Sequence, residues 1–179
     1  MQGARLLSNM ECKHKRLSEP NGLALITIGN SLRGDGGVAA ALSHCLPEHL
    51  AREVCRFDLG SYSGVLQECL IYHKAAIIID STSNDTAPGT VSIVDVSHIL
   101  DQTELLNLRS CHGFSLSEEM RSAKKRGRLP KRIIFFGVEI DKTDWNDKLS
   151  PELEAKLPKL VNKLSFLVAK VVETLNRDA

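Results

Sequence analysis

Three polar segments of the chain carry side chains that could bind a metal ion or activate water. Residues 29–37, with the sequence GNSLRGDGG, contain Asp35; Asp80 directly follows an apolar run; and residues 110–114, with the sequence SCHGF, contain His112. Carboxylate oxygens and imidazole nitrogens are common ligands for divalent metal ions. An imidazole also exchanges a proton near neutral pH, so His112 could instead be a general base. These residues are therefore candidates for metal recognition or hydrolysis.

Each segment also has a simpler explanation. Residues 29–37 could form a flexible turn whose backbone N–H groups hold an anion at the start of a helix. The segment lacks the GxGxxG pattern and the lysine of a phosphate-binding loop, which argues against a nucleotide site. A lone aspartate such as Asp80 is often a turn former. A single loop histidine such as His112 is more often structural or solvated than a ligand.

The sequence lacks the signatures of common hydrolases. His44 and His49 have Pro47 between them, so they cannot lie one helical turn apart as the zinc ligands of HExxH do. Residues 60–64, GSYSG, place a tyrosine where the GxSxG motif has its nucleophilic serine. Cys111 precedes a histidine directly, but the side chains of adjacent residues normally diverge, and a catalytic base usually comes from elsewhere in the chain.

The apolar pattern that must position these residues is typical of an α/β protein. Continuous apolar runs bounded by loops predict strands buried on both faces. Expected strands cover residues 23–28, 52–59, 75–79 and 131–137, with a further edge strand, antiparallel, over residues 90–96. Expected helices cover residues 38–46, 63–73 and 116–125, followed by an amphipathic terminal helix from Leu153 to Leu175 that Pro158 starts or kinks. This order predicts a three-layer α/β/α sandwich with a mostly parallel twisted sheet.

The predicted sheet brings the three polar segments together. In such a sheet, the loops beyond the carboxyl ends of the strands gather at one edge. We therefore expect the loops that carry Asp35, Asp80 and His112 to lie at the same edge of the sheet.

Composition narrows the class of protein and its compartment. The 179 residues include 23 lysines and arginines against 22 acids, so we expect neither nucleic acid nor a membrane surface as a partner. Five cysteines without CxxC spacing indicate reduced thiols and a cytoplasmic protein. No apolar run reaches the roughly 18 residues that span a bilayer. Residues 1–21 lack an apolar pattern, so we expect a flexible leader followed by one α/β domain over residues 22–179. A monomer is expected because packing on the sheet accounts for the one long apolar stripe.

Read together, these segments resemble the hydrogenase maturation endopeptidases. That family has a segment like GNxLxxD(D/E)G after its first strand, matched here by residues 29–37. Its third strand ends in an aspartate and leads to a Pro-Gly turn, matched by Asp80 and residues 88–89. A Ser-x-His-Gly segment and a later strand ending in Gly-Ile-Glu are matched by residues 110–113 and 137–139. The resemblance runs from about residue 23 to the end of the chain.

The resemblance implies an endopeptidase that removes the C-terminal extension of a nickel-iron (NiFe) hydrogenase large-subunit precursor after nickel insertion. In that family, two acidic residues and a histidine recognise nickel that the substrate already holds, so nickel is supplied by the substrate. Zinc or another divalent ion can substitute for it in a crystal. By this resemblance, Asp80 and His112 are the catalytic residues and contact the metal. We therefore expect them to approach each other across one cleft, near enough for a single metal ion to touch both side chains. Asp35 or Gly36 should lie on the rim of that cleft.

The chain departs from the family at Gly36, where the family has its second acidic residue. Asp35 matches the preceding aspartate, which could hold the loop by accepting backbone N–H bonds or could enter the metal shell as the third ligand. Alternatively, water fills the place, or part of the recognition chemistry is lost. Gly36 thus favours an alternative function, a catalytically weak nickel-sensing checkpoint or assembly protein for the same precursor. A small-molecule or nucleotide-binding domain is a third possibility, because this architecture supports unrelated functions.

Overall fold

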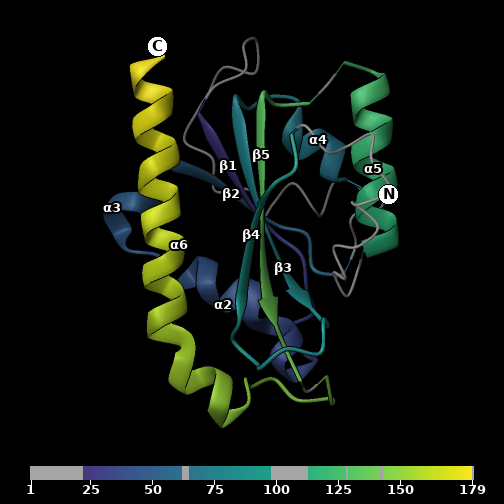
Figure 1. Cartoon of the computed structure of the whole chain (residues 1–179), viewed down its shortest axis with the longest axis vertical. Helices are drawn as coiled ribbons and strands as arrows, with labels where there is room; N and C mark the ends of the chain where they lie inside the picture. Colours follow the sequence, from purple (N-terminus) through teal and green to yellow (C-terminus); the bar gives the residue numbers. More distant parts are fainter. Residues whose placement is uncertain (1–21, 62–64, 98–112, 128, 142, 179) are drawn as a thin grey trace.

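The structure is a computed structural model that describes residues 22–61, 65–97, 113–127, 129–141 and 143–178. Within these residues, five strands form one sheet in the order β2-β1-β3-β5-β4 (Figure 1). The strands are β1 (Leu23–Thr27), β2 (Val54–Asp58), β3 (Ala75–Thr82), β4 (Val91–Asp95) and β5 (Arg132–Glu139). Four run parallel, and the edge strand β4 pairs antiparallel with β5. The predicted mixed α/β sheet and its antiparallel edge strand are confirmed.

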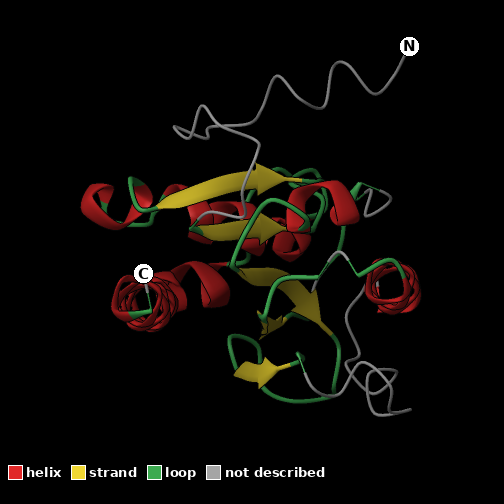
Figure 2. Cartoon of the chain, turned by 90° about the horizontal axis from the view of Figure 1, so that it is seen from above, coloured by secondary structure: helices red, strands yellow, loops and turns green. Residues whose placement is uncertain are grey.

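Helices cover both faces of the sheet, as the predicted sandwich requires. The helical elements are the 3-10 helix η2 (Gly34–Gly37), α2 (Val38–His44), α3 (Glu48–Ala51), α4 (Leu66–Leu70), α5 (Gly113–Lys125) and α6 (Pro151–Arg177). Apolar residues of α2, α3 and α6 share one core cluster, and apolar residues of α4 and α5 share a second one. Figure 2 shows α6 and α5 on opposite sides of the strands.

Successive side chains along each strand point to opposite faces of the sheet, so each helix layer packs against its own core. Leu25 and Ile77 point to the layer of α2, α3 and α6, whereas Ile26 and Ile78 point to the layer of α4 and α5. All of β3 is buried, as expected for a central strand with helices on both sides. Burying a large aliphatic side chain contributes roughly 1.5–3 kcal/mol, so the buried residues of these strands contribute strongly to stability.

The terminal helix is longer than expected at its start. It begins at Pro151, with Ser150 as its N-cap, and Pro158 lies inside it. Pro158 therefore does not start the main segment. The expected amphipathic stripe is present, because Leu153, Leu160, Leu164, Leu167, Val168 and Val171 are buried.

Other element boundaries also differ from the sequence expectation. The β3 strand continues through Asp80 to Thr82, because Asp80 still pairs in register with Gly137 of β5. Asp80 is thus part of a strand, not the first residue of a loop. The short helix α3 was not predicted, and α2 ends before it at His44. The expected leader, residues 1–21, lies outside the described residues.

The structure also tests the expectations about the cysteine thiols and about membrane-spanning segments. Cys45 and Cys69 are free thiols, but Cys55 is disulfide-bonded, so the prediction that all the thiols are reduced is wrong. In the described part of the chain, no helix combines the length and the apolar character needed to cross a membrane.

Candidate functional site

Asp80 lies near the carboxyl end of the central strand β3, where the loops that follow β1, β3 and β5 gather. Its side chain is fully buried, and its Oδ1 accepts a hydrogen bond of 2.7 Å from the Ser81 backbone N–H. Side chains alternate along a strand, so Asp80 lies on the same face as Ile78 and Thr82, the face toward α4 and α5. The fold therefore holds this carboxylate near the end of a strand that is buried along its whole length.

Asp35 lies in the loop after β1 and connects that loop to the start of α6. Its side chain is fully buried. The Ser150 backbone N–H donates to Asp35 Oδ1 at 2.7 Å, and the Ser150 hydroxyl donates to Oδ2 at 2.9 Å. Ser150 Oγ in turn accepts from the Leu153 N–H at 3.3 Å, as an N-cap residue does. Both carboxylate oxygens thus hold the first turn of α6 against the loop.

Further contacts fix the same loop. The Gly34 N–H donates to the Asn146 carbonyl at 2.7 Å, and the Asn146 N–H donates to the Leu32 carbonyl at 3.1 Å. The Arg33 guanidinium carbon lies 4.6 Å from the centroid of the Trp145 ring, a cation–π arrangement. The loop after β1 is therefore supported by the segment that precedes α6.

The two glycines that flank this loop have different requirements. Gly29 has φ +153°, and a Cβ there would lie 2.3 Å from the Gly36 carbonyl oxygen, so the close approach of the backbone requires glycine. At Gly36, φ is not positive. A Cβ at Gly36 would lie 3.4 Å from Arg33 Cβ and 3.5 Å from the Asn30 carbonyl oxygen, which is ordinary contact. The backbone therefore accepts a Cβ at position 36.

His112 and Cys111 lie outside the described residues, so the expected approach of Asp80 to His112 stays a prediction. Among the residues that are described, no group of three histidine, cysteine, aspartate or glutamate side chains is arranged to hold a metal ion. The buried Cys69 is not a candidate nucleophile, because burial and, to a smaller extent, the adjacent Glu68 raise its pKa to about 12. Its thiol stays protonated at neutral pH.

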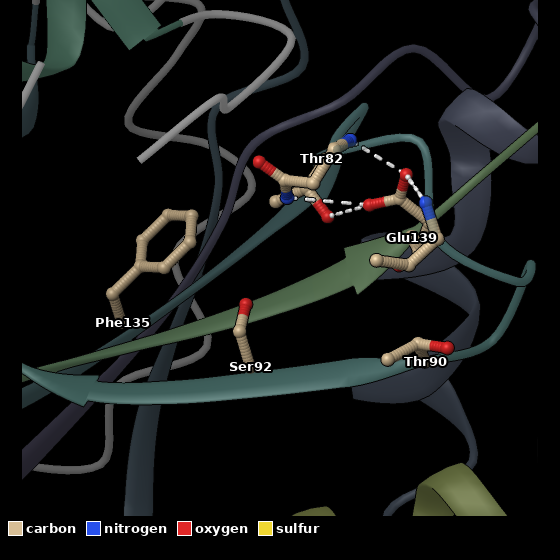
Figure 3. Close-up of a pocket in the computed structure, with 7 residues that line it drawn as sticks. Thr82, Thr90, Ser92, Phe135 and Glu139 are labelled. Atoms are coloured by element: carbon tan, nitrogen blue, oxygen red, sulfur yellow. Dashed lines mark hydrogen bonds between the residues drawn. The ribbon is translucent and has the colours of Figure 1, made fainter. Parts of the chain in front are cut away.

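Glu139, the last residue of β5, organises the loop between β3 and β4, a role that sequence reasoning missed. Its Oε1 accepts from the Asn84 N–H at 2.6 Å and the Thr86 N–H at 3.2 Å. Its Oε2 accepts from the Thr82 hydroxyl at 2.8 Å and the Asn84 side-chain amide at 3.3 Å (Figure 3). Burial alone would raise the pKa of Glu139, but these hydrogen bonds outweigh it and lower the pKa. The carboxylate is therefore ionised at neutral pH.

A cavity of about 270 Å³ lies beside Glu139, on the face of the sheet that also carries Asp80. Figure 3 shows Phe135 at one end of this cavity and Glu139 at the other. The lining residues are Thr82, Asn84, Thr86, Thr90, Ser92, Phe135 and Glu139.

Replacing Glu139 with glutamine is expected to lower the free energy of unfolding at pH 7 by about 2 kcal/mol. Glutamine keeps one accepting oxygen, but the second acceptor and the negative charge that strengthens all four hydrogen bonds are lost. A lowered pKa in the folded state means that this stabilisation is present above the ordinary glutamate pKa, about 4.3, and is lost as the pH falls through the folded value. Urea unfolding of both proteins between pH 7 and pH 3 measures the difference. It should shrink below about pH 4.3, and a constant difference would contradict this role.

Known protein families include one that this chain matches. A family model described as hydrogenase maturation protease matches residues 41–165, more than half of the chain. The matched region includes Asp80 and Glu139, whereas the loop with Asp35 and Gly36 precedes it. No curated protein sequence matches the chain.

Several solved structures share the fold at low sequence identity. The hydrogenase maturating endopeptidase HybD from Escherichia coli is 20% identical, with a TM-score of 0.69 over 84% of this chain and 93% of that one. The NiFe-hydrogenase maturation protease HybD from Thermococcus kodakarensis is 21% identical, with a TM-score of 0.62 over 82% and 99%. A hydrogenase 2 maturation peptidase from Thaumarchaeota archaeon SCGC_AB-539-E09 is 23% identical, with a TM-score of 0.57 over 85% and 98%.

Proposed function

The chain belongs to the hydrogenase maturation protease family, and we propose that it is an endopeptidase that removes the C-terminal extension of a nickel-loaded NiFe-hydrogenase large-subunit precursor. The observation that carries the proposal is the family match over residues 41–165, which spans the positions of both Asp80 and His112. A cytoplasmic location and a monomeric state are part of the same proposal.

Asp80 and His112 contact the nickel of the substrate in this proposal. An anionic oxygen and an imidazole nitrogen are suitable ligands for divalent nickel. The burial of Asp80 supports its role, because a carboxylate removed from bulk water interacts more strongly with a cation. The Ser81 N–H that donates to Asp80 Oδ1 limits the rotation of the carboxylate, as supporting groups do around metal ligands.

Cleavage then requires the scissile peptide bond to lie beside the bound nickel. When it is present in the substrate, the nickel polarises a carbonyl group or a water molecule. Asp80 and His112 position that site, and His112 could instead accept a proton from the attacking water. Asp35 is the candidate for a third ligand, but its two hydrogen bonds with Ser150 favour a role in holding the loop.

A second candidate function is a nickel-sensing checkpoint that binds the precursor without cutting it. The observation that favours it is Gly36, which offers no side chain where the family has an acidic residue.

Incubation with nickel-loaded and nickel-free precursor separates the two functions. We expect rapid removal of the C-terminal extension from the nickel-loaded precursor and none from the nickel-free precursor. The reason is that Asp80 and His112 would contact the precursor only through its bound nickel. Mass spectrometry of the large subunit measures the cut, and pull-down measures binding. Nickel-dependent binding without cleavage would instead support the checkpoint, and neither binding nor cleavage would overturn both functions.

A further inference from the structure

Basic side chains gather at the edge of the sheet where β3 and β5 begin. Seven of the chain's 23 lysines and arginines lie within residues 121–132, and none of its 22 acidic residues does, so the rest of the chain is net acidic. Ala75 pairs with Arg132, so Lys74 and Lys131, which precede them, are neighbours across the two strands. The exposed side chains of this region form one basic surface, made up of Lys74, Lys124, Lys125, Arg126 and Lys131.

Two helices and the sheet bring these side chains to one place. Lys124 and Lys125 lie in the last turn of α5. Arg126 follows them and donates through Nη1 to the Gln67 side chain of α4 at 3.2 Å, so the end of α5 is held against α4. Figure 1 shows the connection from α5 to β5 crossing the top of the molecule, where β3 and β5 begin. The basic surface is therefore built from separate elements of the fold and is more than a run of charges in one loop.

Three lysines of this surface have no acidic partner within the described part of the chain. Asp95 lies at the same edge of the sheet, but it pairs with Arg132 at 3.3 Å. The side chains of Lys74, Lys125 and Lys131 form no ion pair with a described residue. The preference of a helix C-terminus for cations explains Lys125 alone, because the other two lie outside α5. Neighbouring like charges repel, and an anionic partner would remove that repulsion.

The apolar residues of the same segment point inward, which argues against a lipid surface as the partner. Met120 and Ala123 are buried in the core that α5 shares with α4, and Leu129 packs against that core. A helix that lies on a membrane inserts apolar side chains beside its cations, and these three are already used in the core. Nucleic-acid-binding domains are typically basic as a whole, whereas this chain has a formal net charge of only +1. The chemistry of the surface fits an acidic segment of another protein best.

The basic surface and the candidate site lie at opposite edges of the sheet. The β5 strand starts beside the basic surface at Arg132 and ends at Glu139, at the edge that carries Asp80. Its eight residues span roughly 23 Å, at about 3.3 Å per residue. A partner that binds the basic surface therefore leaves the candidate site open.

We propose that the basic surface is a docking site for an acidic segment of a partner protein, which binds there while the candidate site is free to act. Several lysines contact carboxylates of that segment, and each contact between exposed charges is weak by itself. Salt screens such contacts, so the complex forms at low ionic strength and dissociates as the ionic strength rises. The inference does not depend on the proposed function, because no residue of the candidate site takes part in it.

A blocked peptide of alternating glutamate and aspartate is the probe, titrated into the full-length protein and followed by NMR. It should shift the backbone amide signals of Lys74, Lys125 and Lys131. The matching peptide of glutamine and asparagine should bind at least about tenfold more weakly, since several charge pairs are lost together. Equal affinity for the two peptides, or shifts confined to other residues, would overturn the proposal. Tighter binding of an oligouridylate of equal charge, or of anionic lipid vesicles, would also overturn it in favour of that class of partner.

Two triple variants with the same loss of charge separate this surface from a general effect of net charge. The first combines Lys74→Gln, Lys125→Gln and Lys131→Gln, and it should bind the acidic peptide at least about tenfold more weakly than the wild type. The matched control changes three exposed lysines of α6, which lies on the other side of the sheet from α5 (Figure 2), and combines Lys159→Gln, Lys163→Gln and Lys170→Gln. The control should bind the peptide as the wild type does. An equal loss in both variants would refute a specific surface.

Cleavage of nickel-loaded precursor shows whether the surface acts apart from the candidate site. We expect both triple variants to cleave within about twofold of the wild type, because no group of the candidate site is changed. Slower cleavage by the basic-surface variant alone would mean that the surface holds the precursor itself, and it would overturn a separate partner. The peptide titration needs no precursor, so it decides the inference even if the proposed function is wrong.

Discussion

Asp80→Asn is expected to slow cleavage of the nickel-loaded precursor by more than about 100-fold, because loss of a supporting partner of a metal ligand alone costs about 10–100-fold. Asparagine keeps the shape of the side chain and an oxygen that can accept the Ser81 N–H bond. It lacks the negative charge that attracts a divalent cation. The substitution should therefore slow cleavage far more than it lowers the free energy of unfolding.

Single-turnover cleavage and thermal unfolding of the same preparations measure the two effects. Asp58→Asn is a matched control, because Asp58 is the last residue of β2, at the same edge of the sheet. Asp58 accepts hydrogen bonds from the Thr27 hydroxyl and the Gly60 N–H, so its substitution also changes a carboxylate that supports a loop. The control should retain near wild-type cleavage. A folded Asp80→Asn protein that cleaves at the wild-type rate would remove Asp80 from the site.

The sheet could be predicted from the sequence because its signals are local. Residues 75–79 form an uninterrupted apolar run, which is typical of a strand with helices on both faces. The edge strand was also predictable, since residues 90–96 follow a Pro-Gly turn and alternate in polarity. Boundaries were less accurate where pairing between strands outweighs local preference. Asp80 remains in β3 because β5 continues alongside it to Glu139.

The supporting groups of the candidate site could not be predicted in the same way. Asp35 is bonded to Ser150, 115 residues further along the chain, and no local pattern links them. Glu139 is separated by 55 residues from Asn84, one of its donors. The Gly-Val-Glu segment marked the end of a strand, but only the three-dimensional arrangement reveals that its glutamate holds a loop and lines a cavity.

Asp35→Ala is expected to lower the free energy of unfolding by about 2–3 kcal/mol, because it leaves the Ser150 N–H and hydroxyl without their acceptor. Asp35→Asn should cost only about 1 kcal/mol, since the amide oxygen can accept the Ser150 N–H bond and the amide nitrogen can donate to the hydroxyl. For a chain of this size, 1 kcal/mol corresponds to roughly 2–4 °C in Tm, so thermal unfolding resolves the two variants.

Cleavage by the Asp35→Asn protein decides whether Asp35 is also a nickel ligand. Because both of its oxygens are turned to Ser150, we expect cleavage within about threefold of the wild type, less than the roughly tenfold effect of 1.4 kcal/mol. A loss as large as that of Asp80→Asn, in a folded protein, would show that Asp35 has replaced the missing family acid.

Gly36→Asp restores the acidic residue that the family has at this position and tests whether the site lacks a third ligand. The backbone at Gly36 has no positive φ, and a Cβ there meets Arg33 Cβ at 3.4 Å, so the aspartate should not strain the loop. If the place beside the nickel lacks a protein ligand, the new carboxylate should tighten nickel-dependent precursor binding by about tenfold, or about 1.4 kcal/mol. Gly36→Asn is the control for shape, because it adds a side chain of the same size without charge. Equal binding by the aspartate and asparagine variants would mean that the site has no place for a third anionic ligand, and the two-residue arrangement of Asp80 and His112 would then be the one to pursue.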